Sequence, residues 1–257
     1  MSTQIQSIRQ DVAKTGTTIS NWNNMYLLGG VAALLIVLIA LVEIGITFLP
    51  GGYATAETVT DWFHLLQDNW FLGLRNLGLL NIVMVAFGIP LYLALYASHR
   101  NVNQAFAALA MIIAYIGVAV FYATNRAFPM LELSNYYVIA ANEAQRTMIE
   151  AAGQAMLSVG QSHTPGTFLA FTLSEIGGML MAMVMLRGKV FSRGCAYTGM
   201  IGFGLLFVFE ILSSFAPSVH GAILMLAMVG GIASTVWYIL IARRFFQLAL
   251  DDRGDAK

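Results

Sequence analysis

Six long apolar runs constrain this chain more than any other feature. They cover residues 25–48, 71–96, 104–127, 167–186, 195–215 and 219–241. An α-helix rises about 1.5 Å per residue, so about 20 apolar residues cross the roughly 30 Å hydrocarbon core of a bilayer. Each run is therefore predicted to form one transmembrane helix. The fold class that follows is an all-α polytopic membrane protein with six transmembrane helices.

Composition supports this prediction and excludes several other classes of protein. Hydrophobic residues make up 58% of the chain and charged residues only 10%, which is outside the range of a soluble globular domain. Basic and acidic residues balance at 13 each, so nothing points to nucleic acid and no such partner is expected. The single cysteine, Cys195, excludes an internal disulfide framework and a zinc site built from cysteines.

The distribution of lysine and arginine predicts the orientation, because short positively charged loops stay on the cytoplasmic side. Ten basic residues fall on one side of the six runs: Arg9, Lys14, Arg100, Arg187, Lys189, Arg193, Arg243, Arg244, Arg253 and Lys257. Both termini are therefore predicted to be cytoplasmic, with residues 1–24 and 245–257 as polar tails. The run 25–48 is too long for the apolar region of a signal peptide, so we expect a retained anchor.

Two segments on the opposite, outer side are too long to be simple turns, residues 51–70 and 128–166. In the second, small and apolar residues recur at spacings of three and four: Ala141, Ala144, Met148, Ala152, Ala155 and Val159. Asn142, Glu143, Arg146, Glu150 and Gln154 share the other face. This period predicts an amphipathic helix that lies on the outer surface or caps the bundle.

Charged side chains inside the apolar runs cluster toward the outer side. Glu43, Glu175 and Glu210 each lie about 10–12 Å from the outer end of their run, at 1.5 Å per residue. Arg75, Asn76, Arg126 and His220 stand near the same end, whereas the inner half of the predicted bundle carries no charge. These seven residues predict a polar chamber in the outer leaflet. Glu175 is expected to face Arg75 or Arg126, with Gly177 and Gly178 below it allowing a neighbouring helix to approach closely.

Three roles for these charges remain open at this stage. An ionisable group in hydrocarbon costs roughly 2.5–3.5 kcal/mol, so each one suggests a function and a partner. The Glu and Arg groups either fix which helices pack together, or line a ligand-binding or sensing pocket, or relay a proton or ion. A relay is the least favoured, because the inner half offers no path.

Histidines suggest one enzymatic alternative. His64, His163 and His220 all project on the predicted outer side and, with Asp61 or Glu132, offer a zinc site for a membrane-embedded metal-dependent hydrolase. No pair has the His-x-x-x-His spacing, so we expect no metal and no catalytic residue. Lysines occur only in tails and loops, which excludes a retinal pigment, and no motif for another cofactor is present.

A family resemblance rests on six segments: Gly29–Ala33, Ala123–Tyr137, Glu143–Arg146, Ala151–Met156, Val184–Arg193 and Ala196–Gly199. These segments resemble a family of bacterial multi-pass membrane proteins that is catalogued only as a domain of unknown function. It implies a helical bundle of about this length in the bacterial cytoplasmic membrane. It implies no activity and no site residue.

We therefore expect a non-enzymatic membrane protein whose outer-leaflet polar pocket binds a small molecule, a lipid or a partner protein. Besides the bilayer itself, a second copy of the chain or another membrane protein is a possible partner. The competing interpretations are the hydrolase above and a structural subunit of a larger membrane complex.

Overall fold

A computed structural model describes the backbone of residues 2–48, 56–159, 163–216 and 220–254, and the side chains of residues 22–46, 56–159, 163–216 and 223–250. Within these ranges the chain is helical and contains no strand. Several of the helices are long and apolar enough to cross a membrane. The chain is therefore an all-α polytopic membrane protein, as the sequence predicts.

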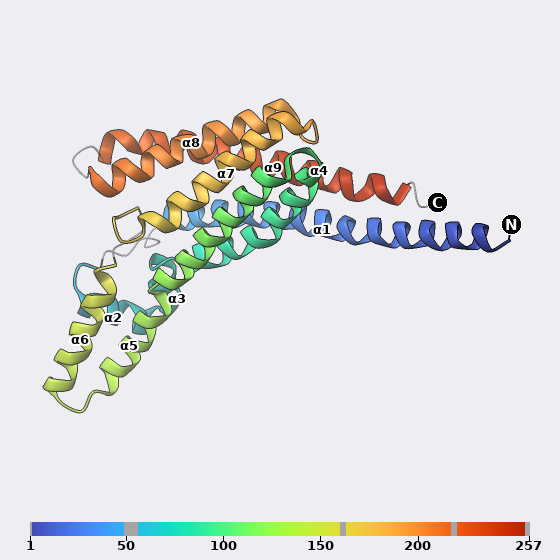
Figure 1. The fold of residues 1–257 in the computed structure, drawn as a ribbon. Coiled ribbons are helices and arrows are strands. Elements are labelled where there is room, and N and C mark those ends of the chain that lie inside the picture. The colour runs from blue at the N-terminus through green and yellow to red at the C-terminus, as the bar shows by residue number, and fades with distance from the viewer. Residues whose placement is uncertain (1, 49–55, 160–162, 217–219, 255–257) are drawn as a thin grey trace.

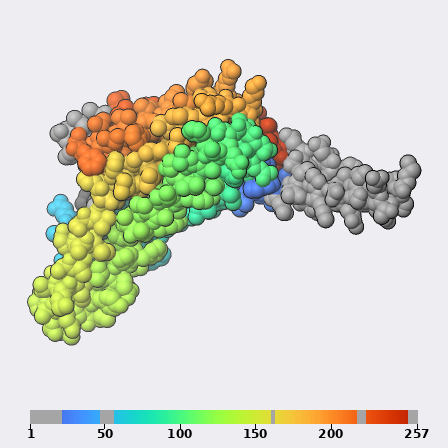
Figure 2. Space-filling view, in the orientation of Figure 1, coloured from blue at the N-terminus to red at the C-terminus, as the bar shows by residue number. Residues whose placement is uncertain are grey.

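The helices form two groups, which we call the bundle and the cap (Figure 1). The bundle consists of α1 (Ser2–Phe48), α4 (Leu79–Thr124), α7 (Phe168–Gly188), α8 (Arg193–Phe215) and α9 (His220–Gly254). The cap consists of α2 (Val59–Asp68), α3 (Trp70–Asn76), α5 (Ala127–Ile139) and α6 (Glu143–Leu157). In the space-filling view, α5 and α6 extend from one end of the bundle (Figure 2).

Helix α4 is a hairpin of two antiparallel legs. Its backbone leaves the helical region at Asn103, where φ is −155° and ψ is 77°. The Tyr115 hydroxyl donates to the Ile89 carbonyl at 2.8 Å, and the Tyr122 hydroxyl to the Ile82 carbonyl at 3.2 Å. In one straight helix, residues 89 and 115 would be about 39 Å apart. Among the described residues, five apolar helical stretches are long enough to span, and the hairpin gives the bundle six legs.

The bundle closes as a ring around an apolar core. Helix α1 packs on α4, α4 on α7, α7 on α8, α8 on α9, and α9 on α1. Fully buried side chains of the core include Leu91, Leu95, Met181, Trp237 and Phe245. The fully buried His99 side chain stacks on Phe191 of this core, with ring centres 5.4 Å apart.

Glycines on α7 bring its neighbours close, as the sequence predicts. A Cβ added at Gly177 would lie 3.0 Å from Cβ of Ala114 on α4. A Cβ at Gly178 would lie 2.6 Å from the Phe203 ring on α8. Association of helices in lipid depends on such close packing, because lipid tails are as apolar as the side chains.

Both chain termini lie at the same end of the bundle (Figure 1). The turn of α4 and the α7–α8 connection lie there too, so Arg100, Arg187, Lys189 and Arg193 gather at what we call the basic end. There the Arg100 guanidinium lies 4.6 Å from the centre of the Trp22 ring. The cap occupies the opposite end, which we call the cap end.

The cap has its own apolar core, built from side chains of α2, α3 and α5 and the start of α4. Its buried members are Val59, Trp62, Phe63, Leu66, Leu74, Leu77, Ala127 and Met130. Helix α2 begins with a capping box, in which the Thr58 hydroxyl accepts from Asp61 N–H and the Asp61 carboxylate accepts from Thr58 N–H. Each cap helix alone is too short to cross a bilayer.

The predicted boundaries of the second apolar run are wrong at both ends. Residues 70–76 form α3, and Gly78, with φ at 99°, separates it from α4. Glycine adopts this left-handed conformation without steric cost, so the chain changes direction there. The predicted loop at 98–101 is helical, and the turn comes at Asn103. Arg75 and Asn76 therefore belong to the cap and not to a span.

Both predicted polar tails are helical where the structure describes them. Residues 2–24 continue α1, and residues 245–254 continue α9. An apolar helix that is already formed extends into polar residues without a new nucleation step, which explains both extensions. The third run ends at Thr124, because α5 begins as a separate helix after Asn125 and Arg126.

The outer amphipathic helix exists, but its predicted packing face is wrong. Helix α6 packs on α5 and α2 through Ile149, Gly153, Met156 and Leu157. Ala144, Ala152 and Ala155 are exposed, and Met148 is 72% exposed. A Cβ at Gly153 would lie 2.6 Å from Val59, so this position needs glycine and decides which face turns inward. Packing of this helix is on the cap, not on the bundle.

Candidate functional site

Polar side chains collect where the bundle meets the cap, between the two apolar cores. We call this region the polar layer and define it by Glu43, Arg75, Asn76, Arg126, His163, Glu175 and Glu210. It draws on α1, α3, α7 and α8, on the residue before α5 and on the segment that precedes α7. Six of these seven residues are site candidates from the sequence, and His163 appears there only as a possible zinc ligand.

Arg75 pairs with Glu43. Nη2 of Arg75 lies 2.9 Å from Oε1 of Glu43 and donates to the Glu43 carbonyl at 3.1 Å. Nη1 of Arg75 donates to Oδ1 of Asn76 at 3.0 Å. The Arg75 side chain is 2% exposed, whereas that of Glu43 is 35% exposed. This ion pair joins the short cap helix α3 to the end of α1.

Glu210 on α8 is completely buried and pairs with His163. Nδ1 of His163 lies 2.5 Å from Oε2 of Glu210, and the Ser214 hydroxyl donates to Oε1 at 3.4 Å. The Ser213 hydroxyl also donates to the His163 carbonyl at 3.1 Å. His163 has a φ of 63°, which is uncommon for a side chain with a Cβ. These bonds hold the segment before α7 against α8.

Glu175 faces into the bundle, but no arginine among the described residues forms an ion pair with it. The residue is 8% exposed, and its Oε2 atom is buried without a hydrogen-bond partner among the described residues. Thr172, one turn away on α7, has a buried hydroxyl with the same property.

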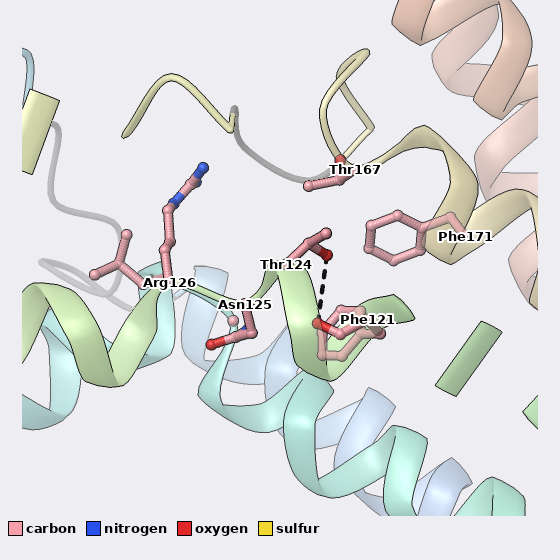
Figure 3. Close-up of a pocket in the computed structure, with 8 residues that line it drawn as sticks. Phe121, Thr124, Asn125, Arg126, Thr167 and Phe171 are labelled. Carbon is pink, nitrogen blue, oxygen red and sulfur yellow. Dashed lines mark hydrogen bonds between the residues drawn. The ribbon is translucent and has the colours of Figure 1, made fainter. Parts of the chain in front are cut away.

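Arg126 borders a small cavity at the junction of α4, α5 and α7 (Figure 3). The cavity measures about 30 Å³ and is lined by Leu77, Gly78, Phe121, Thr124, Asn125, Arg126, Thr167 and Phe171. Arg126 is 6% exposed, and its Nε atom is buried without a partner in the described part of the chain. In Figure 3 the Arg126 side chain stands on one side and Phe171 on the other.

The Phe171 ring separates the cavity from the buried carboxylates. It lines the cavity and lies 4.7 Å, centre to centre, from the His163 ring. It also contacts Phe121 edge to face, at 5.9 Å. The polar layer therefore contains the Glu43–Arg75 pair, the His163–Glu210 pair, the cavity at Arg126, and Glu175, which forms no ion pair with a described residue. The expectation that Glu175 faces Arg75 or Arg126 in a single chamber finds no ion pair to support it.

Sequence reasoning missed two features of this region. The pairing of His163 with Glu210 joins residues 47 apart, and no local spacing signals it. Gly78 and Thr167 were not site candidates, although both line the cavity. One signal could have marked Gly78: it is a glycine between a helix end that contains Asn76 and a long apolar run.

The residues of the hydrolase hypothesis whose side chains the structure describes form no metal cluster. His64 is exposed on α2, and Asp61 is engaged in the capping box with Thr58. His163 is bound to Glu210. The side chain of His220 lies outside the described residues. Among the described residues, no three His, Cys, Asp or Glu side chains are placed to hold a metal ion.

The likeness of this chain to known proteins was sought at three levels. No protein-family model, no curated protein and no solved structure matches it. The functional interpretation therefore rests on the polar layer and its cavity.

Proposed function

We propose that this chain is a non-enzymatic membrane protein whose cap end binds a small molecule or a lipid in the cavity beside Arg126. The observation that carries the proposal is a buried arginine next to unfilled space, between two apolar cores that are otherwise closely packed. A guanidinium in such a place is costly unless it is paired, so a bound group would stabilise it.

The proposal includes a location and an orientation. Basic residues at the end that holds both termini favour a cytoplasmic basic end, which places the cavity on the outer side. The sequence resemblance described above favours a bacterial cytoplasmic membrane. A partner protein at the cap remains a further proposal of the same kind.

A variant that fills the cavity tests the proposal. Thr124 lines the cavity and its hydroxyl donates to the Val120 carbonyl of its own helix. Thr124→Met places a longer side chain in the cavity while keeping the helix. Thr198→Met is the matched control, because the Thr198 hydroxyl makes the same kind of bond, to the Cys195 carbonyl, away from the cavity.

Native mass spectrometry of protein released directly from its membrane gives the readout. We expect a bound molecule on the wild type and on Thr198→Met, and its loss from Thr124→Met. Equal occupancy in all three proteins would show that the cavity is not the binding site. Glu175 does not line the cavity, so Glu175→Gln should leave the occupancy unchanged; a changed occupancy would show that the binding site extends to Glu175.

A further inference from the structure

Arg126 is a buried cation that forms no ion pair among the described residues. Glu43 is paired with Arg75, and Glu210 with His163. None of the residues that line the cavity is Asp or Glu. In the described part of the chain, the cavity wall thus carries a positive charge and no negative charge opposite it.

Three helices of the chain begin at this same cavity. The residues at their N-caps, Gly78 for α4, Arg126 for α5 and Thr167 for α7, all line it. None of these three residues makes a side-chain capping bond, and none of the three helices has an acidic residue in its first turn. One backbone N–H of these helix starts has a side-chain partner: that of Ala127 donates to Oδ1 of Asn125.

The ends of these helices favour negative charge in the cavity. An α-helix carries roughly +0.5 of an elementary charge at its N-terminus and −0.5 at its C-terminus. Two helix C-termini also lie beside the cavity, that of α3 at Leu77 and that of α4 at Thr124, and they offset two of the three N-termini. The remaining positive potential adds to the charge of Arg126, so backbone and side chain attract the same kind of ligand.

The size of the cavity limits the ligand group. One water needs about 10–15 Å³ of such space, so a cavity of about 30 Å³ holds roughly two. A carboxylate has two oxygen atoms and fits this space, whereas the four oxygens of a phosphate do not. Leu77, Phe121 and Phe171 provide an apolar wall for the carbon chain next to such a group.

We infer that the cavity binds the carboxylate of a small organic acid or of a fatty acid, held by the Arg126 guanidinium. This inference rests on the proposed function and adds the chemical class of the ligand. A guanidinium presents paired N–H donors that match the two oxygens of a carboxylate. The one helix N-terminus that is not offset adds to the stabilisation of the bound charge.

The test measures binding of acetate, palmitate and inorganic phosphate to purified protein in phosphatidylcholine nanodiscs. Arg126→Gln should raise the Kd of the carboxylate at least about tenfold, the range for hydrogen bonds to a charged group. Arg126→Lys keeps the charge without the paired donors and should weaken binding less. Arg146→Gln is the control, because Arg146 is an exposed cap arginine that lies over Tyr137, and it should leave the Kd unchanged.

Comparison of acetate with palmitate distinguishes a site for small organic acids from a site for a fatty acid. Binding of both acetate and palmitate supports a site for free acids, and binding of palmitate alone supports a site for a fatty acid. Arg126-dependent binding of phosphate without either carboxylate overturns the inference, as does equal carboxylate binding by the wild type and Arg126→Gln. If Arg126→Gln does not fold, an unchanged Kd in Arg126→Lys overturns it as well.

Failure of this inference can be told from failure of the proposed function. Suppose that Thr124→Met loses the native bound molecule but the wild type binds neither acetate nor palmitate. The proposed binding pocket then stands, and only the inference that its ligand is a carboxylate fails. Equal occupancy of Thr124→Met and the wild type would contradict the proposed function, because the cavity would then not be the binding site.

Discussion

The bundle and the cap pack their cores in different ways. In the bundle, long helices approach through small residues such as Gly177 and Gly178, and the fully buried Trp237 packs on Phe203 of α8. In the cap, short helices enclose Trp62 and Phe63, and a capping box fixes the start of α2. Helices in lipid gain little from burying apolar surface, so the bundle depends on close packing. Short helices of the cap depend on burial and on capped ends.

Where the two regions meet, neither kind of core continues. Arg75 and Glu43 join α3 to α1, and His163 and Glu210 join the segment before α7 to α8. Buried pairs of this kind add little net stability but penalise wrong arrangements. The polar layer therefore positions the cap on the bundle and leaves the cavity at Arg126 between them. Four predictions test this division, from the largest effect to the smallest.

Trp237→Ala should have the largest effect, because it removes the largest fully buried side chain of the bundle. Trp237 is 0% exposed and packs edge to face on Phe203, with ring centres 4.9 Å apart. We expect a loss of about 3 kcal/mol in the free energy of unfolding, the low end for such a truncation, since lipid reduces the transfer contribution. Unfolding in mixed micelles with increasing SDS measures it. Met228→Ala, at a 61% exposed position of α9, should change stability by less than about 0.5 kcal/mol.

Arg75→Gln should cost about 2 kcal/mol, below the value for a fully buried pair because the Glu43 side chain is partly exposed. A double-mutant cycle with Glu43→Gln should give a coupling energy of at least about 1 kcal/mol. The same cycle between Arg75→Gln and Glu175→Gln should give less than about 0.5 kcal/mol. Strong coupling in the second cycle would contradict the division of the polar layer and restore a single chamber.

Gly153→Ala should destabilise the cap alone, by about 1–2 kcal/mol. The added Cβ would lie 2.6 Å from Val59 and 2.7 Å from Phe63, so α6 must shift away from α2. Hydrogen exchange should rise in α2 and α6 while the bundle helices stay protected. Gly231→Ala is the control, since its Cβ would meet no atom within 4 Å and alanine favours the helix. Faster exchange throughout the bundle would show that bundle and cap unfold together.

Acid should loosen the start of α2. Hydrogen bonds from Thr58 lower the pKa of Asp61 below its ordinary value of 3.8. Because the pKa is lower in the folded chain, the capping box contributes above pH 3.8 and is lost as the pH falls through the folded value. Hydrogen exchange at residues 59–62 should therefore rise in acid for the wild type. It should depend less on pH in Asp61→Asn; equal pH dependence in both would exclude the capping box as the cause.

The sequence predicted the bundle better than it predicted the cap. Transmembrane helices are marked by length and apolarity alone, so all six runs correspond to helical legs or parts of them. Arg75 was assigned to a span because Phe71, Leu72 and Leu74 extend the apolar run. Leu74 belongs instead to the core of the cap. Apolarity by itself does not distinguish a side chain that faces lipid from one that faces a small second core.

The sequence determined by itself that the chain is helical, that it spans the membrane repeatedly, and that the acidic groups inside its apolar runs lie toward one end. Each of these depends on local length, period or composition. Tertiary structure decided that Glu43 meets Arg75, that Glu210 meets His163, and that Arg126 borders a cavity. These contacts join residues that are far apart in the chain, and their choice depends on how side chains from several helices fill the same space.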